Sequence, residues 1–239
     1  MKINICDGVF DRFQGYHRAV VLVRGANNRG EEPSLLSKLR EAESAVRQEV
    51  GSSDHRDIPA IASWVEVFRS LGINPNKYPP SVANLIKRTV KGTDLPFVNK
   101  LVCIFNVISL RHKVPCGGDD LSVVTGDLKL DFATGDESYV PLGKADVVEH
   151  PEPGEVIYFD DGNGDVFCRG WCWKNGDRSK ITEETEDVAI NVEGMPPVSV
   201  EDLSLMAEEL AQMVRDHCGG EVSIHLLGPD SPSISLENL

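Results

Sequence analysis

The chain has 239 residues, 41% of them hydrophobic and 26% charged, and its 24 basic and 38 acidic residues give a formal net charge of −14. This size and composition are typical of a globular protein with one large domain or two small ones. The acidic balance argues against DNA and against a broad footprint on any nucleic acid, because such a footprint needs a basic face. A few clustered cations can still hold one RNA end.

The sequence predicts neither a membrane span nor an export signal. The longest apolar run, Leu101–Leu110, is too short to cross a bilayer and contains Asn106. The first residues, Met1–Asp7, lack the basic-then-apolar pattern of a signal peptide. The 6 cysteines show neither a CxxC pair nor zinc-ligand spacing, which predicts reduced thiols and no metal or other cofactor. We therefore expect a cytoplasmic protein without a membrane partner.

The first half of the chain predicts one strand followed by helices. The run Arg18–Arg24 is almost continuously apolar and ends at Gly25, which is typical of a strand covered on both faces. Apolar residues then recur at helical spacing in segments that begin near residues 34, 57, 81 and 97. Asp57 is the expected N-cap of the second helix, with Trp64 on its buried side. Asn106, in the last of these helices, either reaches a pocket or faces water.

The pattern changes after Lys113 from a period of 3.6 residues to a period of 2, which predicts strands. Pro115–Asp120 is interpreted as a turn-rich connector. Tyr139–Leu142 is interpreted as a short edge strand, because proline cannot donate to a ladder. Further strands are expected at 127–132, 155–159, 165–168, 187–193 and 221–226, with tight turns at 134–137 and 160–164.

The last helix is expected to begin at Ser199, with Asp202 three positions on as a short form of the capping box. The segment Pro229–Ser233 near the end is expected to be loose. Helices, then strands, then one helix is the order of an α+β fold. We therefore predict a mostly antiparallel sheet packed with helices, in one domain over residues 1–239.

One stretch, Arg169–Thr185, combines two tryptophans with a polar turn. Trp171 and Trp173 precede the turn Asn175–Asp177, and a dense set of side-chain donors and acceptors follows it. Aromatic faces beside fixed polar groups suit a pocket that grips a small organic group and orients it. The alternative is a hairpin whose tryptophans face the core and whose turn is merely polar.

An ordered series of motifs resembles the B3/B4 domain, which occurs in the β chain of phenylalanyl-tRNA synthetase and in free-standing proteins. The series consists of Asn106–Arg111, Val114-Pro, Gly118–Leu121, Gly126–Leu130, Pro153–Tyr158 and Trp173–Thr185. The likeness extends over about residues 57–220 and is closest to the free-standing form. It implies the fold of that family and, since no other synthetase domain is seen, no aminoacylation.

In the synthetase this domain is the editing site, which hydrolyses tyrosine wrongly attached to the phenylalanine tRNA. The resemblance therefore implies a pocket for an aminoacyl group near Asp119–Leu121 and Trp171–Thr185. The chain departs from the family pattern where the synthetase form has a histidine, because Gly117–Gly118 stand there. It departs again where the synthetase has a Gly-Gly pair near a glutamate, because Asn175–Asp177 stand there.

Asp177 and Thr182 are the expected catalytic residues of that pocket. Asp177 would orient a water molecule and Thr182 would meet the carbonyl oxygen of the ester, which is already activated. The expected substrate-binding residues are Asn106, Asp119, Asp120, Trp171, Trp173 and Glu183. The expected RNA-binding residues are Arg24, Arg111, Lys174, Arg178 and Lys180. The alternative for Asp177 and Thr182 is that they close the turn and cap the segment after it.

Two functions remain open on the sequence. One is a free-standing aminoacyl-tRNA deacylase, whose partner is a tRNA acceptor end that carries an amino acid. The other is a non-catalytic module that binds an amino acid or an RNA end. The polar run around Asp177 favours the first, whereas the missing histidine and the net charge favour the second. The sequence predicts neither the amino acid, nor the tRNA, nor the oligomeric state.

Overall fold

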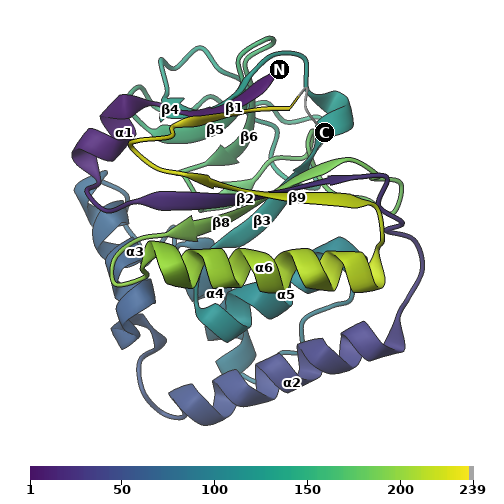
Figure 1. Cartoon of the computed structure of the whole chain (residues 1–239). Coiled ribbons are helices and arrows are strands. Elements are labelled where there is room, and N and C mark those ends of the chain that lie inside the picture. Colours follow the sequence, from purple (N-terminus) through teal and green to yellow (C-terminus); the bar gives the residue numbers. More distant parts are fainter. Residues whose placement is uncertain (237–239) are drawn as a thin grey trace.

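The computed structural model describes residues 1–236, in which two β-sheets and a set of helices pack together (Figure 1). The strands are β1 (Lys2–Ile5), β2 (His17–Arg24), β3 (Cys116–Asp120), β4 (Leu128–Phe132), β5 (Val156–Asp160), β6 (Asp165–Arg169), β7 (Lys174–Asn175), β8 (Val188–Gly194), β9 (Glu221–Leu227) and β10 (Ser233–Ser235). The helices are α1 (Asp7–Arg12), α2 (Pro33–Val50), α3 (Pro59–Ser70), α4 (Ser81–Val90), α5 (Lys100–His112) and α6 (Val200–His217).

The strands form a six-stranded sheet in the order β10-β1-β4-β5-β6-β7 and a four-stranded sheet in the order β3-β8-β2-β9. Only the β1–β4 pair is parallel among the strand pairs of residues 1–236. The predicted α+β fold with mostly antiparallel pairing is confirmed.

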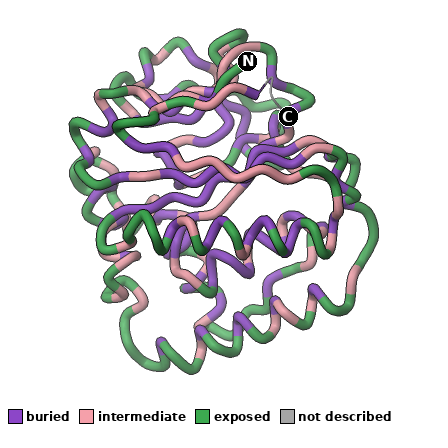
Figure 2. The backbone as a smooth tube through the Cα atoms, in the orientation of Figure 1, coloured by how far each residue is buried: buried purple, intermediate pink, exposed green. Residues whose placement is uncertain are grey.

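The four-stranded sheet lies between the six-stranded sheet and the helical layer (Figure 1). Strand β2 shows the chemical reason. Val21 and Val23 pack into the apolar cluster that contains α2, α5 and α6. Val20 and Leu22 point the opposite way, into the cluster that contains β1, β4 and β5. The predicted strand with two covered faces is therefore confirmed, and the central strands β2 and β8 are mainly buried in Figure 2, whereas the edge strand β9 is mostly intermediate.

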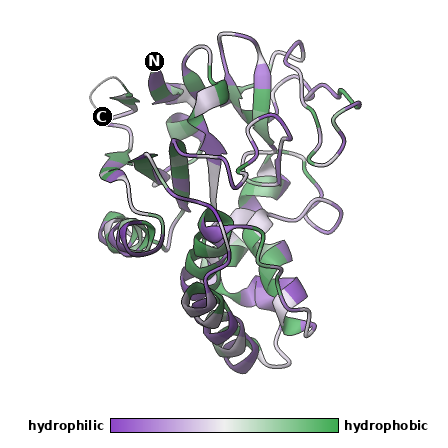
Figure 3. Ribbon diagram, turned by 90° about the vertical axis from the view of Figure 1, so that its right-hand side faces the viewer, coloured by the Kyte–Doolittle hydropathy of each residue, from purple (hydrophilic) through white to green (hydrophobic). Residues whose placement is uncertain are grey.

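Most helices bury one apolar side, and hydrophobic and hydrophilic residues fall on different sides of the helices in Figure 3. Helices α5 and α6 pack against the four-stranded sheet, whereas α2 packs against α4 and α5. Trp64 on α3 is 1% exposed, so its predicted place in the core is confirmed. Helix α6 begins at the predicted capping box, in which the Ser199 hydroxyl accepts from the Asp202 N–H and the Asp202 carboxylate accepts from the Ser199 N–H. Within the described residues, no helix has both the length and the hydropathy that a membrane crossing requires.

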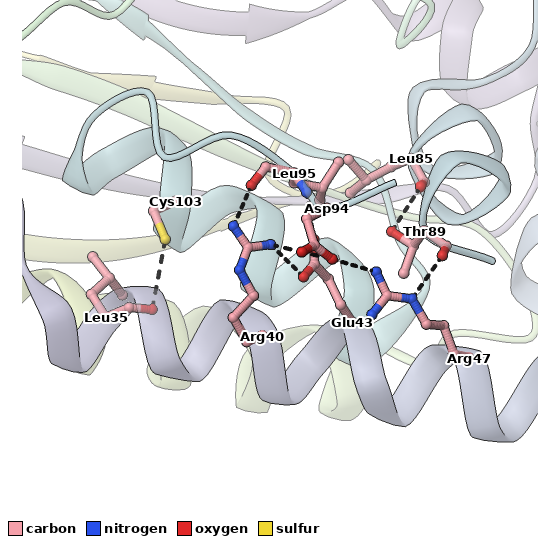
Figure 4. A network of polar contacts seen from close by, with 9 residues as sticks. All are labelled: Leu35, Arg40, Glu43, Arg47, Leu85, Thr89, Asp94, Leu95 and Cys103. Atoms are coloured by element: carbon pink, nitrogen blue, oxygen red, sulfur yellow. Dashed lines mark hydrogen bonds and ion pairs between the residues drawn. The ribbon is translucent and has the colours of Figure 1, made fainter. Parts of the chain in front are cut away.

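A polar network around Glu43 fastens α2 to the chain between α4 and α5 (Figure 4). The fully buried Glu43 carboxylate accepts from the Leu95 N–H at 2.6 Å and pairs with Arg40. Arg40 also donates to the Leu95 carbonyl at 2.7 Å, and Arg47 donates to the Thr89 carbonyl at 2.9 Å. None of these side chains contributes to the buried polar atoms without a partner in the described part of the chain.

The segment Pro115–Asp120, interpreted from the sequence as a connector, forms strand β3 at the edge of the four-stranded sheet. Gly118 explains why this glycine-containing segment forms a strand and why the sequence pattern did not predict one. A Cβ at this position would lie 2.8 Å from the Phe105 ring and 3.1 Å from the Ala189 carbonyl oxygen. Close packing of α5 on the sheet therefore excludes a side chain here, and this tertiary requirement outweighs the low strand preference of glycine.

Two short strands near the chain ends were not predicted. β1 pairs with both β10 and β4, so the segment Pro229–Ser233, expected to be loose, leads directly into sheet pairing. Runs of four and three residues carry too little periodicity to reveal a strand, and their partners lie far away in the chain.

One predicted helix boundary and one predicted strand were also wrong. α3 begins at Pro59 with Ile58 as its N-cap, whereas Asp57 ends a short 3-10 helix, His55–Asp57, that Asp54 caps. Tyr139–Leu142 forms no strand but only single bridges, among them Tyr139 with Glu149.

Candidate functional site

A cavity of about 390 Å³ lies between the two sheets. Its walls come from β2, β3 and β8 of the four-stranded sheet and from β5, β6 and the segment 171–175 of the six-stranded sheet. The lining residues include Arg18, Cys116, Gly117, Gly118, Asp119, Tyr158, Cys168, Trp171, Cys172, Trp173, Lys174, Asn175, Asn191 and Glu193. The volume is within the range of sites for small organic ligands.

Register places a polar patch on the inner face of the four-stranded sheet. Arg18 stands opposite Glu193, and Gly117 stands opposite Asn191. Residues directly opposite in an antiparallel ladder share a face, and so do residues two apart on one strand. Asp119, two residues from Gly117, therefore points to the same face as Asn191 and Glu193. A Cβ on Gly117 would meet only the Asn175 amide, at 3.6 Å, so this position leaves the floor of the cavity open.

A buried ion pair forms one end of the patch. Arg18 and Glu193 are 1% and 5% exposed, and their side chains meet at 2.7 Å. The Tyr16 hydroxyl donates to Glu193 at 2.5 Å and accepts from Arg18 Nε at 3.2 Å. Burial alone would lower the pKa of Arg18, but the Glu193 carboxylate raises it above its usual value. The guanidinium therefore stays charged inside the protein.

Four polar atoms of the cavity wall are buried and have no hydrogen-bond partner among the described residues. They are Arg18 Nη1, the Tyr158 hydroxyl, Trp171 Nε1 and Asn191 Oδ1. Buried polar groups are nearly always paired, and each one left unpaired costs about 1–3 kcal/mol. Their concentration in one cavity marks it as a site that awaits polar groups from a ligand or from water.

Asp119 supplies a buried carboxyl group to the same cavity. Its side chain is 5% exposed and accepts a hydrogen bond from the Ser179 hydroxyl at 2.6 Å. Burial, the largest influence, raises the pKa of Asp119 to about 6. The Ser179 hydroxyl and the Arg18 charge act in the opposite direction and limit the rise. A carboxyl group with this pKa can exchange protons near neutral pH.

The segments 119–121 and 171–185 meet at this point, as the sequence predicted. Besides the Ser179–Asp119 bond, the Asp120 N–H donates to the Ser179 carbonyl at 3.0 Å, and the Thr185 hydroxyl donates to the Asp120 carboxylate at 2.7 Å. Asp120 thus secures the junction, while Asp119 faces the cavity.

Two cysteine thiols, Cys168 and Cys172, also line the cavity, whereas the Cys116 side chain packs against the helical cluster on the opposite face of β3. Burial raises the pKa of both cavity thiols above the ordinary value. The thiols therefore remain protonated, act as small apolar wall groups, and provide no thiolate nucleophile.

Of the residues expected in the site, Asp119, Trp171, Trp173 and Lys174 line the cavity. Trp171 belongs both to the core and to the pocket, the two alternatives that the sequence left open. It packs edge-on against Tyr16 and Trp64 in the core while its edge reaches the cavity wall. Its backbone has a φ of +66°, a conformation that is uncommon for a side chain of this size.

The two residues expected to be catalytic do not line the cavity. Asp177 accepts from the Gly143 N–H at 2.8 Å and pairs with Lys180, which ties the loop after Pro141 to the turn. The Thr182 hydroxyl accepts from the Glu184 N–H at 3.2 Å. Their observed contacts are those of residues that close turns. A direct catalytic role remains a prediction.

Asn106 and Glu183, expected to bind substrate, also lie outside the lining. Asn106 is half-buried on α5, and the Glu183 carboxylate accepts from the Gly30 N–H at 3.2 Å.

The expected RNA-binding cations do not form an unpaired group. Arg24 pairs with Asp187, Arg111 with Glu209, Arg178 with Asp165 and Lys180 with Asp177. Lys174 alone among the five lines the cavity, with its ammonium 5.9 Å from the centre of the Trp173 ring. Four of the five expected cations are therefore paired with a carboxylate, so the positive charge that they offer to an RNA is smaller than the sequence suggested.

Four residues that line the cavity were not predicted from the sequence: Arg18, Tyr158, Asn191 and Glu193. Arg18 and Glu193 stand at the ends of apolar runs, where a charge is typical of a strand that emerges into water. Asn191 could have been predicted as a site residue, because it is a polar residue in the middle of the buried strand Val188–Gly194. A polar residue in such a place needs a partner, and that partner can be a ligand.

Comparison with known families and structures gives the following matches. The model of the family described as the B3/4 domain matches residues 63–219. No curated protein matches the chain. Among solved structures, the chain is similar to an N-terminal fragment of the phenylalanyl-tRNA synthetase β-subunit from Pyrococcus horikoshii. The identity is 12% and the TM-score 0.47, over 92% of this chain and 49% of that chain. The chain thus spans about half the length of that fragment.

Proposed function

Since this chain belongs to the B3/4 domain family, we propose that its cavity receives the aminoacyl group at the acceptor end of a tRNA. We further propose that the protein hydrolyses the ester that joins the amino acid to the ribose. The main support for the proposal is the position of Asp119. It is a buried carboxyl group with a pKa of about 6 in the wall of a ligand-sized cavity. The family resemblance supplies the substrate, and the cytoplasm is where charged tRNA would be met.

Asp119 acts in this proposal as the group that holds and deprotonates a water molecule. The water oxygen bonds to the ester carbonyl carbon as the Asp119 carboxylate takes one proton. The tetrahedral intermediate then collapses, the bond from carbon to the ribose oxygen breaks, and Asp119 returns the proton to that oxygen. The pKa of about 6 suits both directions of transfer near neutral pH. Ser179 orients the carboxylate through its 2.6 Å hydrogen bond.

The edge of β3 offers donors for the negative charge that develops on the carbonyl oxygen. The Asp120 N–H points away from β8, because it donates to the Ser179 carbonyl at 3.0 Å. Successive residues of an antiparallel strand alternate in direction, so the N–H groups of Gly118 and Cys116 point the same way as that of Asp120. Both residues line the cavity. We assign them to the oxyanion, because preorganised backbone donors are an effective means of stabilising it.

Lys174 is the cation best placed to meet a phosphate of the RNA end, because it lines the cavity and, within residues 1–236, forms no ion pair with a carboxylate. One such contact predicts that binding of the tRNA weakens only slightly with salt, since the slope follows the number of neutralised phosphates.

A binding module without catalysis is the second candidate, and two observations favour it. Within residues 1–236 the cavity lining includes no histidine, and burial keeps the thiols of Cys168 and Cys172 protonated. Such a module would hold the aminoacyl end in the same cavity without cleaving it.

The proposal is tested with a panel of mischarged tRNAs. We expect the protein to hydrolyse at least one ester and Asp119→Asn to slow that reaction about 10²–10⁴-fold, the usual contribution of a positioned base. Asp177→Ala and Thr182→Ala are the matched comparisons, and a smaller loss is expected because neither side chain lines the cavity. If every ester survives while the protein binds a charged tRNA, the binding module is the correct function. If Asp177→Ala or Thr182→Ala is as damaging as Asp119→Asn, catalysis depends on the turn.

A further inference from the structure

We propose that this cavity selects an aminoacyl group whose side chain ends in a primary carboxamide, and that Arg18, Tyr158 and Asn191 are the specificity-determining residues. The inference rests on the proposed function only for the statement that the ligand is an aminoacyl group. The chemistry of the end group follows from the cavity wall.

The three residues form one corner of the cavity. The Arg18 guanidinium lies over the Tyr158 ring, with 4.8 Å from Cζ to the ring centre. Asn191 stands two residues from Glu193 on β8, on the same face, and Glu193 is the residue that pairs with Arg18. Burial raises the pKa of Tyr158, and Arg18 and Asn191 both act to lower it, so the three side chains are neighbours, and each has one unpaired buried atom within residues 1–236.

The chemistry of these atoms defines what they can bind. Arg18 Nη1 can only donate, Asn191 Oδ1 can only accept, and the Tyr158 hydroxyl can do either. A carboxamide oxygen accepts from Arg18 and Tyr158 while its NH₂ group donates to Asn191, so that all three atoms are satisfied at once. A hydroxyl group, with two acceptor lone pairs and one donor hydrogen, satisfies all three only if they converge on a single oxygen, and a methyl group satisfies none.

The balance of charge disfavours ionised side chains. The Arg18 charge is already paired with Glu193, and Asp119 adds a second carboxyl group to the same wall. A carboxylate side chain would meet these acidic groups and would have no proton for Asn191. An ammonium side chain would meet the buried guanidinium. A neutral polar end group avoids both conflicts.

Tyr158 and Asn191 lie within residues 63–219, which the B3/4 domain model matches, whereas Arg18 belongs to β2 and lies outside them.

The test uses amino-acid α-amides as probes, because their neutral carbonyl resembles that of the ester. Isothermal titration calorimetry compares asparaginamide with leucinamide, its near-isostere, and threoninamide with valinamide. The α-amides of aspartate and lysine serve as charged probes. We expect asparaginamide to bind at least about 100-fold more tightly than leucinamide, since sites built for a polar group reject apolar analogues by up to about 10⁴–10⁵-fold. Threoninamide should fall between them.

Tyr158→Phe is the decisive variant. Within residues 1–236 the Tyr158 hydroxyl makes no hydrogen bond of normal geometry, so the fold should tolerate the change, while the ratio of asparaginamide to leucinamide affinity should fall about tenfold or more. Tyr78→Phe makes the same chemical change on a ring that packs against Trp173 outside the cavity lining, and should leave the ratio unchanged.

Equal binding of asparaginamide and leucinamide would overturn the inference. So would tightest binding of a charged or hydroxyl probe, or an unchanged ratio in Tyr158→Phe. The mischarged tRNA panel separates this failure from failure of the proposed function. Cleavage of aliphatic aminoacyl esters would reject the carboxamide specificity and keep the hydrolase, whereas selective binding of asparaginamide with no ester cleaved would keep the specificity and reject the hydrolase.

Discussion

The networks around Glu43 and around Glu193 contain the same chemical groups and serve different ends. Each has a buried glutamate that meets an arginine, at 0% exposure for Glu43 and 5% for Glu193. In the first network every buried polar side-chain atom has a partner (Figure 4). In the second, Arg18, Tyr158 and Asn191 each leave one atom unpaired in a cavity. A satisfied network stabilises a fold, whereas an unsatisfied one retains binding capacity at a cost in stability.

The largest expected effect separates the two networks directly. Glu43→Ala leaves the Leu95 N–H buried without an acceptor and Arg40 without its carboxylate. We expect a loss of about 3 kcal/mol in the free energy of unfolding, measured by urea denaturation, with unchanged activity per folded molecule. Glu66→Gln is the control, because the Glu66–Arg69 pair is exposed and contributes about 1 kcal/mol or less. A proportional loss of activity would show that the helical layer also shapes the cavity.

Asp119→Asn tests the second network through pH. The pKa of Asp119 is about 6 in the folded protein and about 4 when unfolded. Between these values the native state binds a proton that the unfolded state has released, so the stability of the protein falls as pH rises from about 4 to 6. Asparagine removes this penalty. We expect the variant to be more stable than the wild type by about 2–3 kcal/mol at pH 8 and by about half as much at pH 5, while hydrolysis is slowed.

Urea denaturation at the two pH values provides the measurement for Asp119→Asn. An equal stability difference at pH 5 and pH 8 would mean that Asp119 titrates normally and is not the buried base.

The adjacent glycines of β3 allow a finer test of the boundary between packing and site. Gly118→Ala places a Cβ 2.8 Å from the Phe105 ring, which predicts a loss of about 2 kcal/mol in stability. Gly117→Ala meets only the Asn175 amide at 3.6 Å and should change stability by about 0.5 kcal/mol or less. The Gly117 variant should instead weaken ligand binding, because its methyl group enters the cavity. Similar melting temperatures for the two variants would contradict this assignment.

The smallest expected effect compares two buried tyrosines. The Tyr139 hydroxyl donates to the Asn175 carbonyl at 3.0 Å, whereas the Tyr158 hydroxyl has no hydrogen-bond partner of normal geometry in the described part of the chain. Replacement by phenylalanine should lower the free energy of unfolding by about 1 kcal/mol at Tyr139. At Tyr158 it should leave the free energy of unfolding unchanged or raise it slightly. Thermal denaturation of the two variants measures the difference. A destabilised Tyr158→Phe would show that its hydroxyl is already satisfied in solution.

Much of the fold was predictable because its determinants are local. The apolar run of β2, the stripe around Trp64 on α3 and the capping box at Ser199 each depend on residues within one or two turns of chain. The proximity of the segments 119–121 and 171–185 was also expected, whereas the hydrogen bond from Ser179 to Asp119 between them was not.

The terminal strands, β3 and most of the cavity wall depended on contacts between segments that are distant in the chain. The sequence by itself determined that Arg18 and Glu193 flank apolar strands, but the register of β2 on β8 placed them opposite each other and away from water. A charge at the end of a strand has the same local sequence whether it meets solvent or a buried partner. The tertiary structure decides between these outcomes, because desolvation acts only once the second sheet covers the first.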